Sequence, residues 1–244
     1  MSVYGDFAAL YDAFMADVPY KSWCGYLHSL IQTRKPGAKV LLDMACGTGS
    51  ITRGMHKIGY RVSGSDLSDA MLRRATELSR SEGKSIPFYH MDLTDFTVIN
   101  PVEVITVMCD GINYLNGEQL CEFASCAYDA LTDGGLLLFD LRTAYQMHEV
   151  MGDNTFADEN DDGAYILITH KEEDGTTMEL TLFLKAEGES YRRSFESHRL
   201  YIHSAEDAAD ALYEAGFSEV EAYGFLTEQD MTGSDERIMM IARR

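Results

Sequence analysis

An apolar run that ends in a carboxylate and two glycines lies near the start of this 244-residue chain. Residues 40–42 read Val-Leu-Leu, Asp43 follows them, and Gly47 and Gly49 come soon after. An unbroken apolar run is typical of a strand buried in a parallel sheet. Glycine has no Cβ, so the backbone can turn sharply there and a ligand can lie against it. The run therefore predicts a buried strand that delivers Asp43 to a nucleotide-like cofactor.

The composition indicates a folded, acidic protein. With 45% hydrophobic and 11% aromatic residues, the chain can bury a large core, either as one domain or as one domain with a small insertion. The formal charge of -20 repels a phosphate backbone, and the pairs Arg192-Arg193 and Arg243-Arg244 are too short to form a basic groove. We therefore do not expect nucleic acid as a partner.

The remaining composition gives no sign of a metal site or a membrane. The five cysteines have no CxxC spacing, and the seven histidines form no HxxxH or HExxH pair. No apolar run approaches the roughly 20 residues of a membrane span, and the N-terminus has no basic signal-peptide start. We expect reduced thiols, no metal, no membrane segment and a cytoplasmic location.

Strand-like and helix-like periods alternate through the first half of the chain, which predicts an α/β fold with a parallel sheet covered by helices on both faces. The expected strands are 39–43, 61–65, 86–90, 103–108 and 135–140, and the expected helices are 49–58, 68–82 and 117–131. A turn at Asp133-Gly134-Gly135 is expected to separate the last helix from the last strand.

Other patterns flank this core. Aromatic residues at 4, 7, 11 and 14 predict one amphipathic helix, and a second is expected from about 22 to 33. Period-two alternation near 164–171, 176–187 and 190–203 predicts an inserted three-stranded antiparallel sheet, and we interpret the acidic run 158–162 as a solvated loop. A helix at 205–215 and strands near 218–224 and 236–242 should close the main sheet. The expected units are residues 1–35, 36–145, 146–203 and 204–244.

The glycine turn does not fit a dinucleotide fold well. The fingerprint G-x-G-x-x-G would need a third glycine where the chain has Thr52, and Asp43 occupies a position that is generally apolar. The pattern Asp43-x-Ala45-x-Gly47-Thr48-Gly49 instead resembles the glycine loop of class I S-adenosylmethionine-dependent methyltransferases. This resemblance spans about residues 38–140 and implies S-adenosylmethionine (SAM) as cofactor, with S-adenosylhomocysteine (SAH) as product.

The resemblance also implies where the cofactor lies. Asp66, 23 residues after Asp43, matches the acid that binds both ribose hydroxyls, although an acid there could also cap the next helix. Asp92 matches the acid near the adenine amino group. In similar enzymes the N-terminal helices, here 1–35, form a lid. The expected cofactor-binding residues are Tyr20, Trp23, Asp43, Ala45, Gly47, Gly49, Asp66, Leu67, Met71, Met91, Asp92, Leu93 and Cys109.

The acceptor side has no diagnostic motif. The arrangement of aromatic N-terminal helices and inserted sheet looks most like small-molecule N-methyltransferases, including amino-sugar N,N-dimethyltransferases, which implies a small-molecule acceptor, most simply an amine. His198 could equally be a structural cross-strand residue. The insert could also join two copies through its edges. The expected catalytic residues are Tyr11, Asp110 and His198, and the expected substrate-binding residues are Asn113, Tyr114, Tyr191 and Arg193.

Three other functions fit the same fold less well. A methyltransferase that acts on RNA or protein shares the motifs, but the acidic charge disfavours RNA. A SAM-sensing protein could keep the fold without turnover. A nucleotide-dependent oxidoreductase lacks the expected third glycine.

Overall fold

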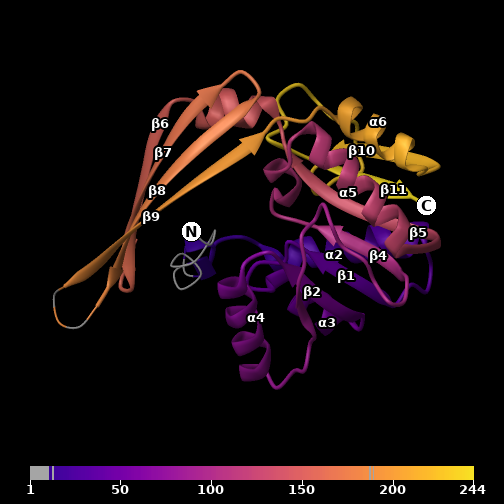
Figure 1. The fold of residues 1–244 in the computed structure, drawn as a ribbon, viewed down its shortest axis with the longest axis horizontal. Helices are drawn as coiled ribbons and strands as arrows, with labels where there is room; N and C mark the ends of the chain where they lie inside the picture. Colours follow the sequence, from indigo (N-terminus) through magenta and orange to yellow (C-terminus); the bar gives the residue numbers. More distant parts are fainter. Residues whose placement is uncertain (1–10, 13, 187, 189) are drawn as a thin grey trace.

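A computed structural model of the chain describes residues 11, 12, 14–186, 188 and 190–244. Figure 1 shows an α/β body from which an antiparallel sheet projects to one side. The body contains a seven-stranded sheet in the order β10-β11-β5-β4-β1-β2-β3. Strands β1 to β5 run parallel, β11 lies antiparallel beside β5, and β10 lies antiparallel beside β11. The predicted fold class is therefore confirmed.

The elements of the body follow the predicted alternation closely. Its strands are β1 (Val40–Met44), β2 (Arg61–Asp66), β3 (Phe88–His90), β4 (Val102–Val107), β5 (Leu131–Arg142), β10 (Glu219–Gly224) and β11 (Arg237–Arg243). Its helices are α2 (Tyr20–Arg34), α3 (Ser50–Ile58), α4 (Asp69–Ser81), α5 (Gly117–Ala130) and α6 (Ala205–Ala215), with a short 3₁₀ helix η1 (Gly111–Tyr114).

The body has a hydrophobic core on each face of its sheet, and β5 contributes to both. Leu137 and Phe139 pack with Phe123 of α5, whereas Leu136 and Leu138 pack with Leu27 of α2. Alternate residues of a strand point to opposite faces, so a continuous apolar run fills both layers. Helix α2 therefore covers the sheet as part of the body. The predicted amphipathic helix at 4, 7, 11 and 14 lies mostly outside the described residues.

The start of β5 differs from the prediction. A turn was expected at residues 133–135, but the strand begins at Leu131, directly after α5. The register of β5 against β4 shifts between the pairs Val102–Leu131 and Val104–Leu136. Extra residues at such a shift bulge out of the ladder, so Gly134 takes a φ of 64° within the strand.

The projecting sheet has four strands, so the predicted three-stranded insert was wrong by one strand. The sheet comprises β6 (Asn154–Asn160), β7 (Gly163–Glu172), β8 (Gly175–Lys185) and β9 (Tyr191–Tyr201), in that order. Strand β6 occupies part of the acidic stretch that was interpreted as a loop. Charged residues are common on edge strands because they discourage pairing with other chains, and their polarity concealed this strand. A π-helical segment η2 (Gln146–Met151), also unpredicted, leads into it.

The described residues include no helix that is both long and apolar enough to cross a membrane.

Candidate active site

A cavity of about 490 Å³ opens at the carboxyl ends of the parallel strands. This edge is where α/β sheets bind ligands, because the loops after the strands converge there. Most predicted site residues meet at this cavity. The predicted residues that line it are Tyr11, Tyr20, Asp43, Ala45, Gly47, Asp66, Leu67, Met71, Met91, Asp92, Leu93, Cys109 and Tyr114.

The glycine turn forms the floor of the cavity between β1 and α3. Ala45, Gly47 and Gly49 all have positive φ, at 49°, 54° and 78°. A Cβ on Gly47 would meet open space, whereas one on Gly49 would lie 3.1 Å from the Phe88 ring. Gly47 therefore keeps the turn open toward the cavity, and Gly49 permits close packing beneath it. Gly49 is not among the described residues that line the cavity.

Asp43 connects the elements around the glycine turn by hydrogen bonds. Its carboxylate accepts hydrogen bonds from Thr52 Oγ1 at 2.5 Å and from Thr106 Oγ1 at 2.8 Å, which links β1 to α3 and β4. The side chain is buried, and burial raises its pKa to about 6 even though the two hydroxyl bonds oppose that shift. Asp43 thus both supports the turn and contributes an acidic surface to the cavity.

Asp66 and Asp92 stand at the ends of β2 and β3 on the cavity wall. Asp66 accepts the Gly47 N–H and the Ser68 N–H, each at 2.8 Å, and burial raises its pKa. Asp92 accepts both the N–H and the hydroxyl of Thr94 at 2.9 Å. Ser68, not Asp66, is the N-cap of α4. The two carboxylates are therefore held in place by their own turns and face the same cavity.

Phenols and a thiol line the opposite part of the cavity. Tyr11 and Tyr20 share a hydrogen bond, and burial raises the pKa of both phenols. Burial also raises the pKa of the Cys109 thiol to about 12. Cys109 and Asp110 both have φ near 60°, a conformation that few residues other than glycine adopt. The phenols of Tyr11 and Tyr20 and the thiol of Cys109 stay protonated at neutral pH, so this wall is uncharged.

Asp110 lies behind this wall rather than on it. Burial raises its pKa, but the Arg142 and Arg237 guanidinium groups outweigh that effect and hold the pKa below its usual range. Arg142 Nε lies 2.5 Å from the carboxylate, and Arg237 bridges it to the carboxylate of Asp140. The Arg237 guanidinium also lies over the Trp23 ring, 5.6 Å from its centre. Neither Asp110 nor Trp23 is among the described residues that line the cavity.

His198 is not among the described residues that line the cavity, but it contacts Tyr114, which lines it. The Tyr114 hydroxyl lies 3.4 Å from Nδ1 of His198, and Nε2 of His198 lies 3.4 Å from a carboxylate oxygen of Glu196. His198 is buried on β9. The side chain of Asn113 contacts backbone groups instead. Its amide donates to the carbonyls of Arg142 and Tyr201 and accepts the Arg142 N–H. Asn113 therefore joins β9 to the body and does not line the cavity.

Tyr191 and Arg193 lie away from the cavity, near the start of β9. This end of β9 adjoins the β8–β9 turn, which Figure 1 shows at the distal tip of the projecting sheet. Both side chains are exposed. The structure therefore does not bring these two residues together with the other predicted site residues.

Several cavity residues were not predicted. Most are sequence neighbours of a predicted residue in the same turn, so the position of that turn after its strand could have indicated them. Gln119 and Leu115 come from the segment after η1, where no sequence pattern marked them. The lining residues that were not predicted are Cys46, Thr48, Ser50, Ile51, Ser68, Met108, Gly111, Leu115 and Gln119.

Comparison with known proteins agrees with the fold. A methyltransferase-domain family model matches residues 41–135. A protein of Geobacillus sp. (strain WCH70) that is provisionally named a methyltransferase is 30% identical over 249 residues, covering 99% of each chain. The dTDP-3-amino-3,6-dideoxy-alpha-D-glucopyranose N,N-dimethyltransferase of Streptomyces fradiae is 26% identical, covering 88% of this chain and 84% of that one.

A solved structure extends the agreement to three dimensions. The S-adenosylmethionine-dependent methyltransferase of Clostridium acetobutylicum ATCC 824 matches with a TM-score of 0.88 and 26% identity, covering 98% of both chains. The chain belongs to the class I S-adenosylmethionine-dependent methyltransferases. SAM is accordingly its cofactor.

The cavity residues fit this cofactor chemically. A ribose presents two neighbouring hydroxyls, and carboxylates such as Asp66 and Asp92 are strong acceptors for hydroxyl and amino donors. The thioether and alkyl groups of Met71, Met91 and Leu93 offer an apolar slot of the kind that a flat base occupies. The open face of Gly47 lets a ligand lie against the backbone. These residues would hold the nucleoside part of SAM.

Proposed function

We propose that this methyltransferase transfers the methyl group of SAM to an amine of a small molecule. When bound, SAM supplies an electrophilic methyl carbon on a sulfonium sulfur. The observation that carries the proposal is the chain Tyr114–His198–Glu196, which leads from the cavity wall into the projecting sheet. The names of full-length relatives that act on amino sugars support the same acceptor class.

The walls of the cavity perform the positioning that methyl transfer requires. An in-line displacement needs alignment of the reacting atoms and exclusion of water, and no covalent group on the protein. Tyr11, Tyr20 and Cys109 line one wall of the cavity with neutral polar groups. Tyr11 orients the acceptor there. Asp110, held between two guanidinium groups, fixes the turn that carries Cys109.

Tyr114 and His198 remove the proton that an ammonium acceptor carries. Only the neutral amine has a lone pair for attack, so a base within reach raises the reactive fraction. The Tyr114 hydroxyl lies on the cavity, and His198 stands behind it as the base. Glu196, on the same face of β9, lies 3.4 Å from Nε2 and orients the imidazole.

The experiment that tests this function is a panel of acceptors in matched pairs. Purified protein is incubated with SAM and with small molecules that differ only in an amine or a hydroxyl, including nucleotide-linked amino sugars, and SAH is measured. The expected result is SAH formation with amines, and a mass gain of one or two methyl groups on nitrogen. Turnover of the hydroxyl compounds alone would contradict an amine acceptor.

We also infer that two copies pair through the outer face of the projecting sheet. The row Glu159–Ala164–Phe183–Arg193 runs across that face, negative at the β6 edge and positive at the β9 edge. The neighbouring row presents the exposed side chains of Ile166 (38%) and Phe195 (46%).

A two-fold axis parallel to the strands matches these charges. It places β6 of one copy over β9 of the other, so each Glu159 faces an arginine at position 193 and the apolar side chains lie between the charges. Such self-complementarity is what a symmetric interface requires. It also gives Tyr191 and Arg193 a role outside the cavity.

A further inference from the structure

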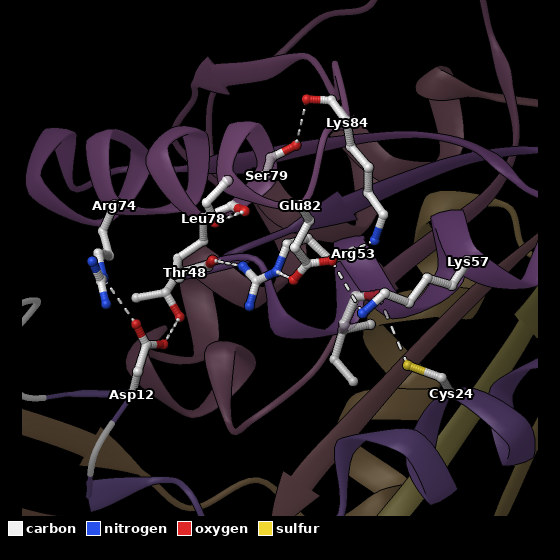
Figure 2. A network of polar contacts seen from close by, with 12 residues as sticks. Asp12, Cys24, Thr48, Arg53, Lys57, Arg74, Leu78, Ser79, Glu82 and Lys84 are labelled. Carbon is white, nitrogen blue, oxygen red and sulfur yellow. Dashed lines mark hydrogen bonds and ion pairs between the residues drawn. The ribbon is translucent and has the colours of Figure 1, made fainter.

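Asp12 connects the chain segment before α2 to two elements of the cofactor site. One carboxylate oxygen of Asp12 accepts the Thr48 hydroxyl at 2.6 Å, and the other accepts Arg74 Nε at 3.0 Å. Figure 2 shows Asp12 between these two partners. Thr48 belongs to the glycine turn, and Arg74 belongs to α4. A single side chain therefore joins the N-terminal segment to the floor and to a neighbouring helix.

The partners of Asp12 are themselves fixed. The Thr48 carbonyl accepts a hydrogen bond from Arg53 of α3, and Arg53 Nε lies 3.0 Å from Glu82 at the end of α4 (Figure 2). Glu82 is also paired with Lys57 at 3.0 Å and Lys84 at 2.5 Å. The glycine turn and α4 thus form one braced unit. Asp12 attaches the chain beside Tyr11 to this unit.

This attachment closes the cavity on one side. Tyr11, the residue before Asp12, lines the cavity and is hydrogen-bonded to Tyr20, and Thr48 lines the cavity from the floor. The Asp12–Thr48 bond therefore joins a wall of the cavity to its floor. If it opened, one of the contacts that hold the chain at Tyr11 against the floor would be lost, and a ligand in the cavity would gain a path to solvent.

The contacts of Asp12 with Thr48 and Arg74 can break and re-form reversibly. The Asp12 and Arg74 side chains are 26% and 37% exposed, and ion pairs that remain open to water are weak. The hydrogen bond from Thr48 to Asp12 is the stronger of the two contacts, because Thr48 is buried and its hydroxyl lies 2.6 Å from the carboxylate. Loss of the Asp12 contacts would leave the ion pairs of Arg53, Lys57, Glu82 and Lys84 in the braced unit intact.

We propose that Asp12 is a positioning residue that fastens Tyr11 against the cofactor cavity and sets the rate at which SAM and SAH leave. Asp12 acts through Tyr11, which it seats in the cavity wall, and through Thr48, which it holds in the floor. The proposal rests on the cofactor site alone and does not depend on the nature of the methyl acceptor.

The test is the dissociation rate of SAH, measured by rapid mixing with the single tryptophan as a fluorescent probe. That residue, Trp23, contacts Tyr20 with ring centres 5.8 Å apart, so its emission reports on the cavity wall. The variants are Asp12→Ala, Arg74→Ala and the double variant. Arg73→Ala is the matched control, because it removes the same charge from an adjacent position on α4 without touching Asp12.

We expect Asp12→Ala to release SAH about tenfold faster than the wild type, which corresponds to about 1.4 kcal/mol. Arg74→Ala should accelerate release in the same direction, and the double variant should match Asp12→Ala because both changes break one attachment. Asp12→Asn keeps an acceptor for Thr48 and should fall between the wild type and Asp12→Ala. Arg73→Ala should release SAH at the wild-type rate.

Two results would overturn the proposal. The first is a release rate in both Asp12→Ala and Asp12→Asn within twofold of Arg73→Ala. The second is that Asp12→Ala lowers the free energy of unfolding of the ligand-free protein by as much as it lowers the barrier to SAH release. Such a result would indicate general damage to the fold. Since SAH binds without any acceptor, failure of the amine proposal leaves this test intact.

Discussion

Arg237 of the last strand forms an ion pair with Asp110 at the end of the fourth strand. The two residues meet because β11 lies beside β5, and β5 lies beside β4. Arg237 also pairs with Asp140, so one guanidinium serves two buried carboxylates. The C-terminal strand therefore supports the strained turn that carries Cys109 into the cavity.

Removal of Arg237 should destabilise the protein strongly. Arg237→Ala leaves Asp110 and Asp140 buried with one partner fewer, and breaking a buried pair in this way costs about 3–5 kcal/mol. Urea unfolding at neutral pH measures the change, with Arg73→Ala as the surface control. A loss below about 1 kcal/mol would mean that Arg142 alone compensates both acids.

Replacement of Asp66 should weaken cofactor binding. Asp66→Asn keeps the shape but removes the charge that strengthens hydrogen bonds from ribose hydroxyls. We expect a loss of about 2–3 kcal/mol, or roughly 30- to 150-fold in SAH affinity. Calorimetric titration measures it, and Asp95→Asn, an exposed acid, is the control. Unchanged affinity in Asp66→Asn would remove this residue from the cofactor site.

Asp43 should make stability fall as pH rises through the acid range. Burial raises its folded-state pKa to about 6, while the unfolded value is about 3.9. The folded state therefore holds this proton more tightly, and its contribution is present below pH 4 and lost by about pH 6–7.

The neutral variant Asp43→Asn isolates this effect. The free energy of unfolding of the wild type should fall relative to that of Asp43→Asn by up to about 3 kcal/mol between pH 4 and pH 7. Urea unfolding across that range gives the difference. A pH-independent difference would show that folding does not raise the pKa of Asp43.

His198 should affect turnover far more than cofactor binding. His198→Gln retains a side chain that can hydrogen-bond to Tyr114 but cannot accept the proton, so kcat should fall about 100-fold. The SAH dissociation constant should stay within twofold. Kinetics against pH with an amine acceptor test this, and His170→Gln on the exposed face of β7 is the control. Equal kcat in the two variants would leave His198 a structural role.

Charge reversal should test the pairing of copies. Arg193→Glu places like charges opposite each other in the symmetric interface and should shift the protein toward monomers. The double variant Glu159→Arg/Arg193→Glu restores opposite charges and should restore the dimer. Light scattering after size-exclusion chromatography measures the mass. A monomeric wild type at high micromolar concentration would contradict the interface.

The sequence predicted most of the body because its signals are local. Two glycines after an apolar run specify a turn wherever they occur, and the acid after each strand lies at the same sheet edge because parallel strands end there. Strand β6 escaped prediction since an exposed edge strand needs no apolar alternation. Its partner β7, and not its own composition, makes it a strand.

By itself, the sequence determined the α/β alternation, the glycine turn and the places of Asp43, Asp66 and Asp92 at the ends of successive strands. Only the tertiary structure decided which other side chains share the cavity. Asp110 and Asn113 were predicted site residues in the segment after β4, yet both contact partners distant in sequence and neither is among the described residues that line the cavity. Asp12 meets Thr48 and Arg74 for the same reason. Contacts between distant segments depend on how whole elements pack, and no local pattern records that packing.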